Sequence, residues 1–327
     1  MKSIYLGIDI SKKTLDICLV DQKSEAFFKI ENKIKAIKKL FKQITTLDAE
    51  IFIAMENTGL YNYNLYEVLK DYSFNVYVID PKHIKRSIGL VRGKNDKVDA
   101  KRIATFIERN YQDFDCWKPT SEAVQNIKIL MSQRRHKVKT RQAIKQQNKE
   151  LKTVKRTKII SSSMKINLKE IEQINKHIAA IEKLIKEEIA NDSVLEKDIE
   201  RIRTIPGIGS VTAWTLAVKT DGFVRLTNPR KLACFAGVVP FEQQSGTSLK
   251  TKPRVSKMAD MQLKSVLQMA AMRAVRMDND LKHFYLRKVE EGKNKMSVLN
   301  AVRNKLIHIA MALIKNKSFY ENRLVLS

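Results

Sequence analysis

The sequence is poor in cysteine, and the cysteines it has form no pattern. Three of the 327 residues are cysteine, Cys18, Cys116 and Cys234, and none stands in CxxC spacing. An odd number of widely separated cysteines predicts reduced thiols, as in a cytoplasmic protein, and not a disulfide framework. The five histidines also lack metal-ligand spacing. A zinc site is therefore not expected.

Long apolar runs are missing as well. The longest mostly apolar stretch, Ile205–Val218, contains one proline and two glycines, so it is too short and too broken to cross a membrane. Asp9 interrupts the apolar start of the chain, which predicts that no secretory signal peptide is present. We therefore expect no membrane partner.

Acidic residues are few relative to basic ones. The chain has 35 Asp and Glu against 62 Lys and Arg, a net charge of +27, which is unusual for a metabolic enzyme. Such an excess predicts a polyanionic partner, most often a nucleic acid. At 43% hydrophobic residues the chain can fill a sizeable core, and its length favours two or three domains.

The first third alternates strand and helix patterns. Strand-like runs lie at 3–8, 14–20, 26–30, 50–55 and 74–79, and helical spacing at 33–47, 60–71 and 97–110. The order βββαβαβα predicts a mixed sheet with helices packed on it.

The middle of the chain predicts two long helices. Residues 117–158 carry 13 Lys and Arg against two Glu, and they contain no glycine. After a short polar patch, isoleucines recur at positions 171, 174, 178, 181 and 185, the spacing of a heptad seam. We expect an antiparallel helical hairpin or coiled coil that serves as a dimerisation arm or grips nucleic acid. The alternative is a helical spacer with a solvated face.

The last third is mostly helical, with apolar helical spacing at 258–277 and 296–314 and a basic loop at 243–257. Its opening segment, IPGIGSVTA, is typical of a helix-hairpin-helix turn. Gly207 and Gly209 would let backbone N–H groups approach a DNA phosphate without obstruction. The alternative is a tight turn followed by a helix cap.

Carboxylates in the first third are candidates for chemistry. Asp9 and Glu56 lie at strand ends, and Asp96 and Asp99 share one face of a helix start. If they converge over one sheet edge, they repel each other unless Mg²⁺ neutralises them, and two such ions can clamp a phosphodiester during displacement. Each residue alone is equally consistent with a turn or a helix cap.

Two lysines belong to the same hypothesis. Lys94 and Lys97 flank the second carboxylate pair and could hold a phosphate backbone.

The segment GIDIS also has a competing interpretation. It opens actin-like sugar kinases and ATPases, but the Gly-rich second phosphate loop of those enzymes is missing here.

Ser245 lies in the segment AGVVPFEQQSG. A serine before glycine is usually part of a turn, and no His or Asp partner lies near it in sequence. Metal and basic residues can nevertheless activate a serine to attack a phosphodiester. Basic residues follow it at once: Lys250, Lys252, Arg254 and Lys257.

Taken in order, these motifs resemble the DEDD transposases of bacterial insertion sequences, the bridge-RNA-guided serine recombinases related to the pilin-gene invertase Piv. GID, the Glu after the fourth strand and KxDxxDA match the acidic tetrad of that family's RuvC-like, RNase H-fold domain. The middle matches its coiled-coil arm, and IPGIG, AGVVP and QSG match its transposase domain. The resemblance implies domains at 1–115, 116–198 and 199–327.

The resemblance also implies a mechanism. Two Mg²⁺ held by the tetrad would polarise a scissile phosphate, and Ser245 would attack it to form a covalent phosphoserine link. The serine and the tetrad that act together would come from different subunits of a homo-oligomer, a dimer or tetramer. A structured guide RNA from the element's flank would pair with donor and target DNA. The setting would be the bacterial cytoplasm, at the nucleoid.

One stretch departs from the family pattern. Where many members have Lys-x-Gly-Asn-x-x-Leu-Arg, this chain has Ala259, Asp260 and Lys264 in place of Gly, Asn and Arg. Two other functions are compatible with the residues alone. One is a metal-dependent, Holliday-junction-resolving nuclease without serine chemistry, and the other is a non-catalytic nucleic-acid-binding protein.

Overall fold

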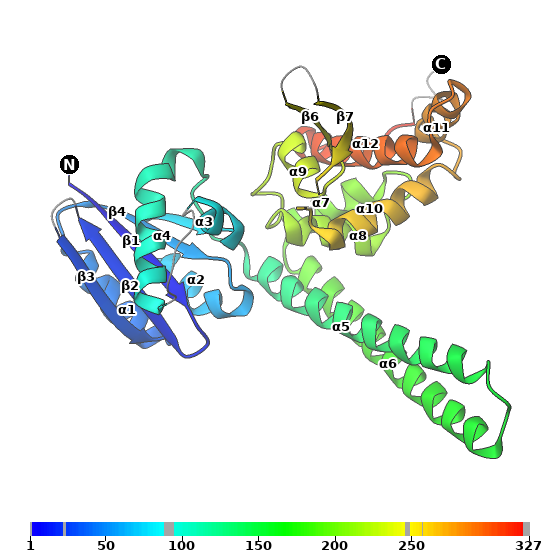
Figure 1. Cartoon of the computed structure of the whole chain (residues 1–327), viewed down its shortest axis with the longest axis horizontal. Coiled ribbons are helices and arrows are strands. Elements are labelled where there is room, and N and C mark those ends of the chain that lie inside the picture. The colour runs from blue at the N-terminus through cyan, green and yellow to red at the C-terminus, as the bar shows by residue number, and fades with distance from the viewer. Residues whose placement is uncertain (1, 22–23, 88–94, 246–248, 257, 323–327) are drawn as a thin grey trace. The chain divides into compact units, whose positions relative to one another are not determined.

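The computed structural model describes residues 2–21, 24–87, 95–245, 249–256 and 258–322 (Figure 1). The chain forms two compact units, 1–119 and 120–327. The arm expected at 116–198 thus belongs to the second unit from residue 120 onward. The division into three domains stays a prediction about functional modules.

The N-terminal unit is built on a five-stranded mixed sheet. Its strands are β1 (Ser3–Ile10), β2 (Thr14–Asp21), β3 (Ser24–Glu31), β4 (Glu50–Glu56) and β5 (Asn75–Ile79). The order is β3-β2-β1-β4-β5. β1, β2 and β3 pair antiparallel, whereas β1, β4 and β5 pair parallel. The predicted mixed α/β sheet is therefore confirmed.

Helices cover both faces of this sheet. α1 (Ile34–Ile44) and α2 (Tyr63–Leu69) bury their apolar sides on one face, against alternate residues of β1 such as Leu6 and Ile8. α4 (Asp96–Asn110) packs on the other face. Two short 3₁₀ helices, Gly59–Asn62 and Tyr111–Asp113, and α3 (Pro81–Ser87) complete the unit. The sequence patterns did not predict α3.

α4 lies unusually close to the sheet at Gly7. A Cβ atom at this glycine would lie 2.1 Å from the Ala100 carbonyl oxygen and 2.3 Å from the Ala104 nitrogen. Both helix residues are alanines and fully buried. The small side chains on α4 and the missing one on β1 therefore let the helix backbone contact the strand directly, which fixes how close α4 lies to the sheet.

The second unit starts with a helical hairpin of α5 (Glu122–Leu151) and α6 (Lys158–Ala190), which pack side by side along the arm (Figure 1). Ser121 and Thr157 cap the two helices through backbone N–H groups. The α6 residues turned inward are Ile171, Ile174, Ile178, Ile185 and Ile189. The isoleucine spacing in the sequence thus identified the packed face.

Polar contacts cross between the two arm helices. Arg134 Nε donates to Glu182 at 2.7 Å, and Arg141 donates to Asn175 at 2.8 Å. Nearer the far end, Asn167 donates to the buried Asn148 at 2.8 Å. A buried polar group needs a specific partner, so the Asn148–Asn167 contact favours one register of the hairpin.

The rest of the unit is a helical core with a small β-hairpin. Its elements are α7 (Ser193–Arg203), α8 (Ser210–Lys219), α9 (Pro229–Phe235), β6 (Pro240–Ser245), β7 (Leu249–Val255), α10 (Met261–Ala274), α11 (Asp280–Glu290) and α12 (Lys295–Asn316). The base of the arm joins this core through Val124, Ile127 and Met131. Among the described residues, no helix has the length and apolar character needed to span a bilayer.

The prediction of a loop at 243–257 is wrong. β6 and β7 pair antiparallel there, with a register irregularity between Phe241 and Gln243. Lysines and Pro253 hide the strand pattern, because strands are normally recognised by β-branched and aromatic residues. A bulge in a two-stranded ribbon tolerates such a proline.

The two glycines of the α7–α8 turn differ in their surroundings. Gly207 has a φ of +85°, and a Cβ atom on it would lie 2.2 Å from the Ala270 carbonyl oxygen of α10. Gly209, the N-cap of α8, has open space around the same position. Gly207 is therefore required by packing, whereas Gly209 is free to face a ligand.

We expect Gly207→Ala to lower the free energy of unfolding by roughly 2–4 kcal/mol, because it adds both a steric overlap and a strained backbone conformation. Gly209→Ala, the matched control, should lower it by less than about 1 kcal/mol. Urea denaturation followed by circular dichroism measures both. Equal effects of the two changes would contradict the assigned packing role.

Candidate active site on the α4 face of the sheet

Asp9 and Glu56 lie at the carboxyl ends of two neighbouring parallel strands. Ile8 of β1 pairs with Met55 of β4, so the next residue of each strand is Asp9 and Glu56. Side chains alternate along a strand. Because Gly7 and Ala54 face α4, the two acidic residues that follow two positions later belong to that same face.

The start of α4 brings a second pair of carboxylates to this place. Asn95 caps the helix by accepting a hydrogen bond from the Lys97 N–H at 3.1 Å. Asp96 and Asp99 both lie in the first turn. The partial positive charge of a helix N-terminus favours carboxylates at these positions. The helix N-terminus therefore stabilises the negative charges of these two aspartates.

Asp9 lies near three other aspartates, and their charges act on it. Burial raises the pKa of Asp9, and the negative charges of Asp99, Asp96 and Asp16 raise it further. Like charges in a partly buried place oppose ionisation. A positive charge placed nearby therefore favours the ionised form of Asp9.

Asp16 is a residue that the sequence reasoning did not select. It pairs with Asp9 across the β1–β2 ladder and is only 6% exposed. The signal was present in the sequence, because an antiparallel pair joined by a short turn places residues 9 and 16 opposite each other. It was not recognised, since the register was not predicted.

Two basic side chains partly neutralise this acidic cluster. Lys29 Nζ lies 3.1 Å from both carboxylate oxygens of Asp16 and 3.9 Å from Asp96. Arg102 lies 2.7 Å from Asp99, one turn along α4. These ion pairs supply the positive charge that the cluster needs in the absence of any other cation.

The donor set suits a hard divalent cation, because carboxylate oxygens are the ligands that Mg²⁺ prefers. As the side chains stand, however, no three Asp, Glu, His or Cys groups among the described residues are assembled around one point at ligand distance. To hold an ion together, these carboxylates would have to turn away from Lys29 and Arg102. The residues thus fit the ion by the chemistry of their donor atoms.

The serine candidate belongs to the other unit. Ser245 is the last residue of β6, and its backbone pairs with Leu249 of β7. Lys250 and Lys252 also lie in β7, and only their backbone is described. Arg254 pairs with Phe241 and is exposed. Lys94 and Lys257 lie outside the described residues.

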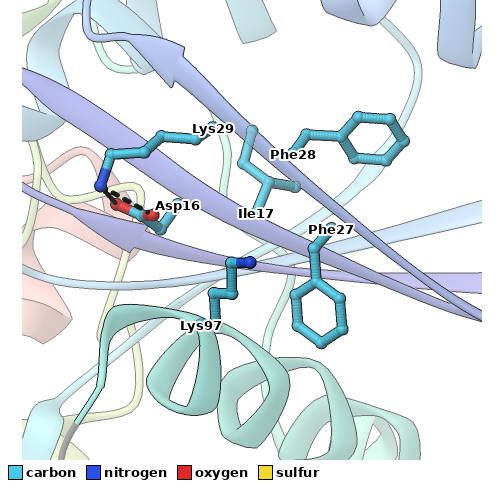
Figure 2. A pocket seen from close by; sticks show the side chains of 6 residues that line it. All are labelled: Asp16, Ile17, Phe27, Phe28, Lys29 and Lys97. Atoms are coloured by element: carbon cyan, nitrogen blue, oxygen red, sulfur yellow. Dashed lines mark hydrogen bonds and ion pairs between the residues drawn. The ribbon is translucent and has the colours of Figure 1, made fainter.

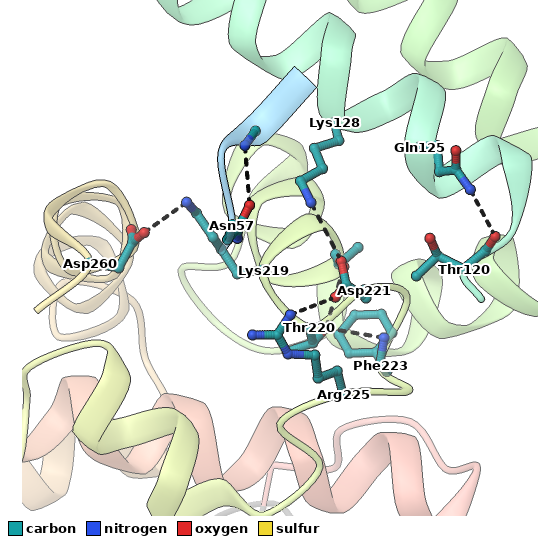
Figure 3. A network of polar contacts seen from close by, with 12 residues as sticks. Asn57, Thr120, Gln125, Lys128, Lys219, Thr220, Asp221, Phe223, Arg225 and Asp260 are labelled. Atoms are coloured by element: carbon teal, nitrogen blue, oxygen red, sulfur yellow. Dashed lines mark hydrogen bonds and ion pairs between the residues drawn. The ribbon is translucent and has the colours of Figure 1, made fainter. Parts of the chain in front are cut away.

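The stretch that departs from the family pattern has a structural role here. Asp260 caps α10 by accepting a hydrogen bond from the Leu263 N–H at 2.7 Å. It also pairs with Lys219, at the end of α8, at 2.7 Å (Figure 3). Gly237 packs against Ala259, so a Cβ there would lie 2.2 Å from the Ala259 Cβ. The replacements therefore tie α10 to its neighbours.

A second set of contacts shown in Figure 3 fixes the turn after α8. Asp221 lies 3.8 Å from Lys128 of α5 and 3.4 Å from Arg225. The buried Thr220 hydroxyl accepts a hydrogen bond from the Phe223 N–H at 3.1 Å. This turn thus joins the base of the arm to the helical core.

Comparison with known proteins matches both units. Residues 6–154 match a transposase family, the IS110-type DEDD transposases, and residues 199–286 match the transposase IS116/IS110/IS902 family. The pilin gene-inverting proteins of Moraxella bovis and Moraxella lacunata are each 25% identical, over 99% of this chain and 99% of theirs. The transposase for insertion sequence element IS1111A of Coxiella burnetii is 23% identical, over 98% of this chain and 92% of its own length.

The two matched regions follow each other in the order that the sequence motifs predicted. The chain belongs to the IS110 family of DEDD transposases and is a DNA transposase or recombinase.

Proposed function

We propose that this transposase cleaves and exchanges DNA strands with Asp9, Glu56, Asp96 and Asp99 as its metal-binding residues and Ser245 as its nucleophile. The observation that carries the proposal is geometric: Asp9 and Glu56 lie at the ends of neighbouring parallel strands, on the face against which α4 packs, and Asp96 and Asp99 lie in the first turn of that helix. The raised pKa of Asp9, caused by burial and by nearby aspartates, agrees with this placement. Mg²⁺, as one or two ions, would supply Lewis-acid polarisation of a phosphodiester oxygen there.

Each residue then has a defined part. The four carboxylates would hold the cation, which would supply Lewis-acid polarisation, and Asp16 keeps Lys29 beside them. Lys29 and Arg102, which pair with Asp16 and Asp99, would face the phosphate backbone of the bound strand. Lys97 and Lys94 contact the same backbone from the start of α4.

The serine step is a displacement at phosphorus. The Ser245 Oγ forms a bond to the scissile phosphorus, and the bond from phosphorus to the 3′-oxygen breaks. The hydroxyl proton passes to solvent or to the departing 3′-oxygen, which becomes a 3′-hydroxyl. Attack by a 3′-hydroxyl from another strand reverses the reaction, so strands are exchanged without net hydrolysis.

Other parts of the chain would hold the nucleic acids. We assign backbone contacts to Gly207 and Gly209, as a helix-hairpin-helix motif, and to Lys250, Lys252, Arg254 and Lys257. The α5–α6 hairpin would act as a coiled-coil arm in a homodimer or homotetramer. The three functional modules would be 1–115, 116–198 and 199–327.

The second candidate is a metal nuclease that resolves junctions without serine chemistry. One observation favours it: all four carboxylates lie in the N-terminal unit, which has its own cores. A non-catalytic nucleic-acid-binding protein needs neither the carboxylates nor the serine.

Replacement of Ser245 by Ala distinguishes these functions. We expect the variant to form no covalent protein–DNA adduct on element-end DNA with Mg²⁺, since the nucleophile is gone. Strand joining should fall at least about 100-fold. Denaturing gel electrophoresis of labelled DNA measures both. Ser193→Ala, at an exposed serine of the same unit, is the control. Unchanged cleavage by the Ser245 variant would favour the nuclease.

Replacement of Asp9 by Asn tests the acidic cluster through stability and activity together. The raised pKa of Asp9 means that its ionised form destabilises the folded state as pH rises through that pKa. In EDTA at neutral pH the variant should therefore melt at a higher temperature than the wild type, and this difference should vanish at low pH.

Mg²⁺ should raise the melting temperature of the wild type more than that of Asp9→Asn, and strand joining by the variant should be lost. Asp48→Asn, at an exposed loop position, should change neither property. Strand joining that survives in Asp9→Asn would show that the proposed cluster is not the catalytic site, as a non-catalytic binding protein requires.

A structured RNA from the element's flank is proposed to select the DNA sites by base pairing. Purification in high salt after expression with native flanking DNA should leave one such RNA bound. Sequencing should show loops complementary to the element ends and to an insertion site. Recovery of bulk nucleic acid alone, removable by salt, would count against a guide and favour protein-based recognition.

A further inference from the structure

The edge strand β3 runs beside the first turns of α4 and leaves a hollow between them. Glu25 pairs with Lys101 at 2.6 Å, and Lys29 lies 3.9 Å from Asp96. The hollow has a volume of about 160 Å³ (Figure 2). The side chains that line it belong to Asp16, Ile17, Phe27, Phe28, Lys29 and Lys97.

An exposed aromatic ring forms one wall of this hollow. Phe27 is 41% exposed and pairs with Cys18, which is buried under α4. Its ring therefore lies on the α4 side of the sheet, as Figure 2 shows. Phe28 is equally exposed, at 40%, but it belongs to the opposite face because side chains alternate. An apolar ring exposed in this way beside an acidic cluster is not part of the packed core of the unit.

The opposite wall carries an available positive charge. Lys29 is occupied by Asp16 and Asp96, whereas Lys97 has no ion-pair partner within the ranges that the structure describes. Lys97 is exposed, and only its backbone N–H is used, in the helix cap. The hollow thus offers a flat apolar surface and an ammonium group side by side.

The size of the hollow limits what it can hold. Pockets that enclose whole small molecules measure about 300–1,000 Å³. A hollow of about 160 Å³ suits one part of a larger ligand. A nucleotide combines a flat ring with a phosphate, which matches the ring of Phe27 and the charge of Lys97.

We propose that this hollow is a nucleotide subsite in which Phe27 stacks on one unpaired base of the DNA strand processed at the acidic cluster, while Lys97 contacts the adjoining phosphate. The assignment of the strand to DNA rests on the proposed function, because Asp16 lines the hollow and also lies beside Asp9 of the acidic cluster. The base must be unpaired, since a paired base already stacks on its neighbours and does not present its face.

Binding of a fluorescein-labelled oligodeoxythymidine to the full chain, measured by anisotropy in EDTA, tests this subsite without catalysis. Phe27→Ala should weaken binding about tenfold, the effect of losing one base–aromatic stack. Phe27→Trp should retain the affinity of the wild type. Leu47→Ala, at an equally exposed apolar side chain of the same unit that does not line the hollow, should leave it unchanged.

The same titration on duplex DNA should be insensitive to Phe27→Ala, whereas Lys97→Gln should weaken both ligands and reduce the salt dependence of binding. Equal affinities of Phe27→Ala and Leu47→Ala for the single strand would overturn the proposal. A loss confined to oligouridine would also overturn it, because the subsite would then serve RNA. A changed oligomeric state of Phe27→Ala in sedimentation would assign the ring to a contact between copies instead.

These outcomes are separable from those of the proposed function. If Phe27→Ala binds the single strand weakly but wild-type protein never joins strands, the subsite stands and the proposed function fails. If Phe27→Ala binds normally and Asp9→Asn abolishes joining, the subsite fails and the proposed function stands.

Discussion

The direct contact between the backbone of α4 and Gly7 of β1 determines where the acidic residues meet. Because no side chain separates the two elements, the start of the helix reaches the carboxyl ends of β1 and β4. A helix held farther out by an ordinary side chain would carry Asp96 and Asp99 away from Asp9. The glycine in GID and the alanines in α4 therefore matter as much to the site as the acidic residues do.

The same closeness causes electrostatic repulsion within the folded unit. Carboxylates that must share a small volume oppose each other's ionisation, and the pKa of Asp9 records this. Lys29 and Arg102 reduce the repulsion by pairing with Asp16 and Asp99. The unit thus carries its own counter-ions, with which the divalent cation of the proposed function would compete. Such sites trade stability for function.

Much of this arrangement was predictable from the sequence. Alternating strand and helix patterns gave the mixed sheet, and the isoleucine spacing gave the packed face of α6. Features that depend on pairing between distant segments were not predictable. Asp16 gains its place only through the β1–β2 register, and β6–β7 pairs despite a sequence of lysines and proline. Local patterns also did not reveal that Gly207 is required by α10, because that contact joins residues far apart in the chain.

The arm has a consequence for how this chain can change during evolution. Only its base enters the helical core, and its buried isoleucines repeat at seven-residue intervals from Ile171 to Ile185. Matched seven-residue deletions or insertions in α5 and α6 preserve the inward face, and each changes the reach of the hairpin by about 10 Å. The length of the arm can thus change in seven-residue steps while the helical core that its base joins stays unaltered.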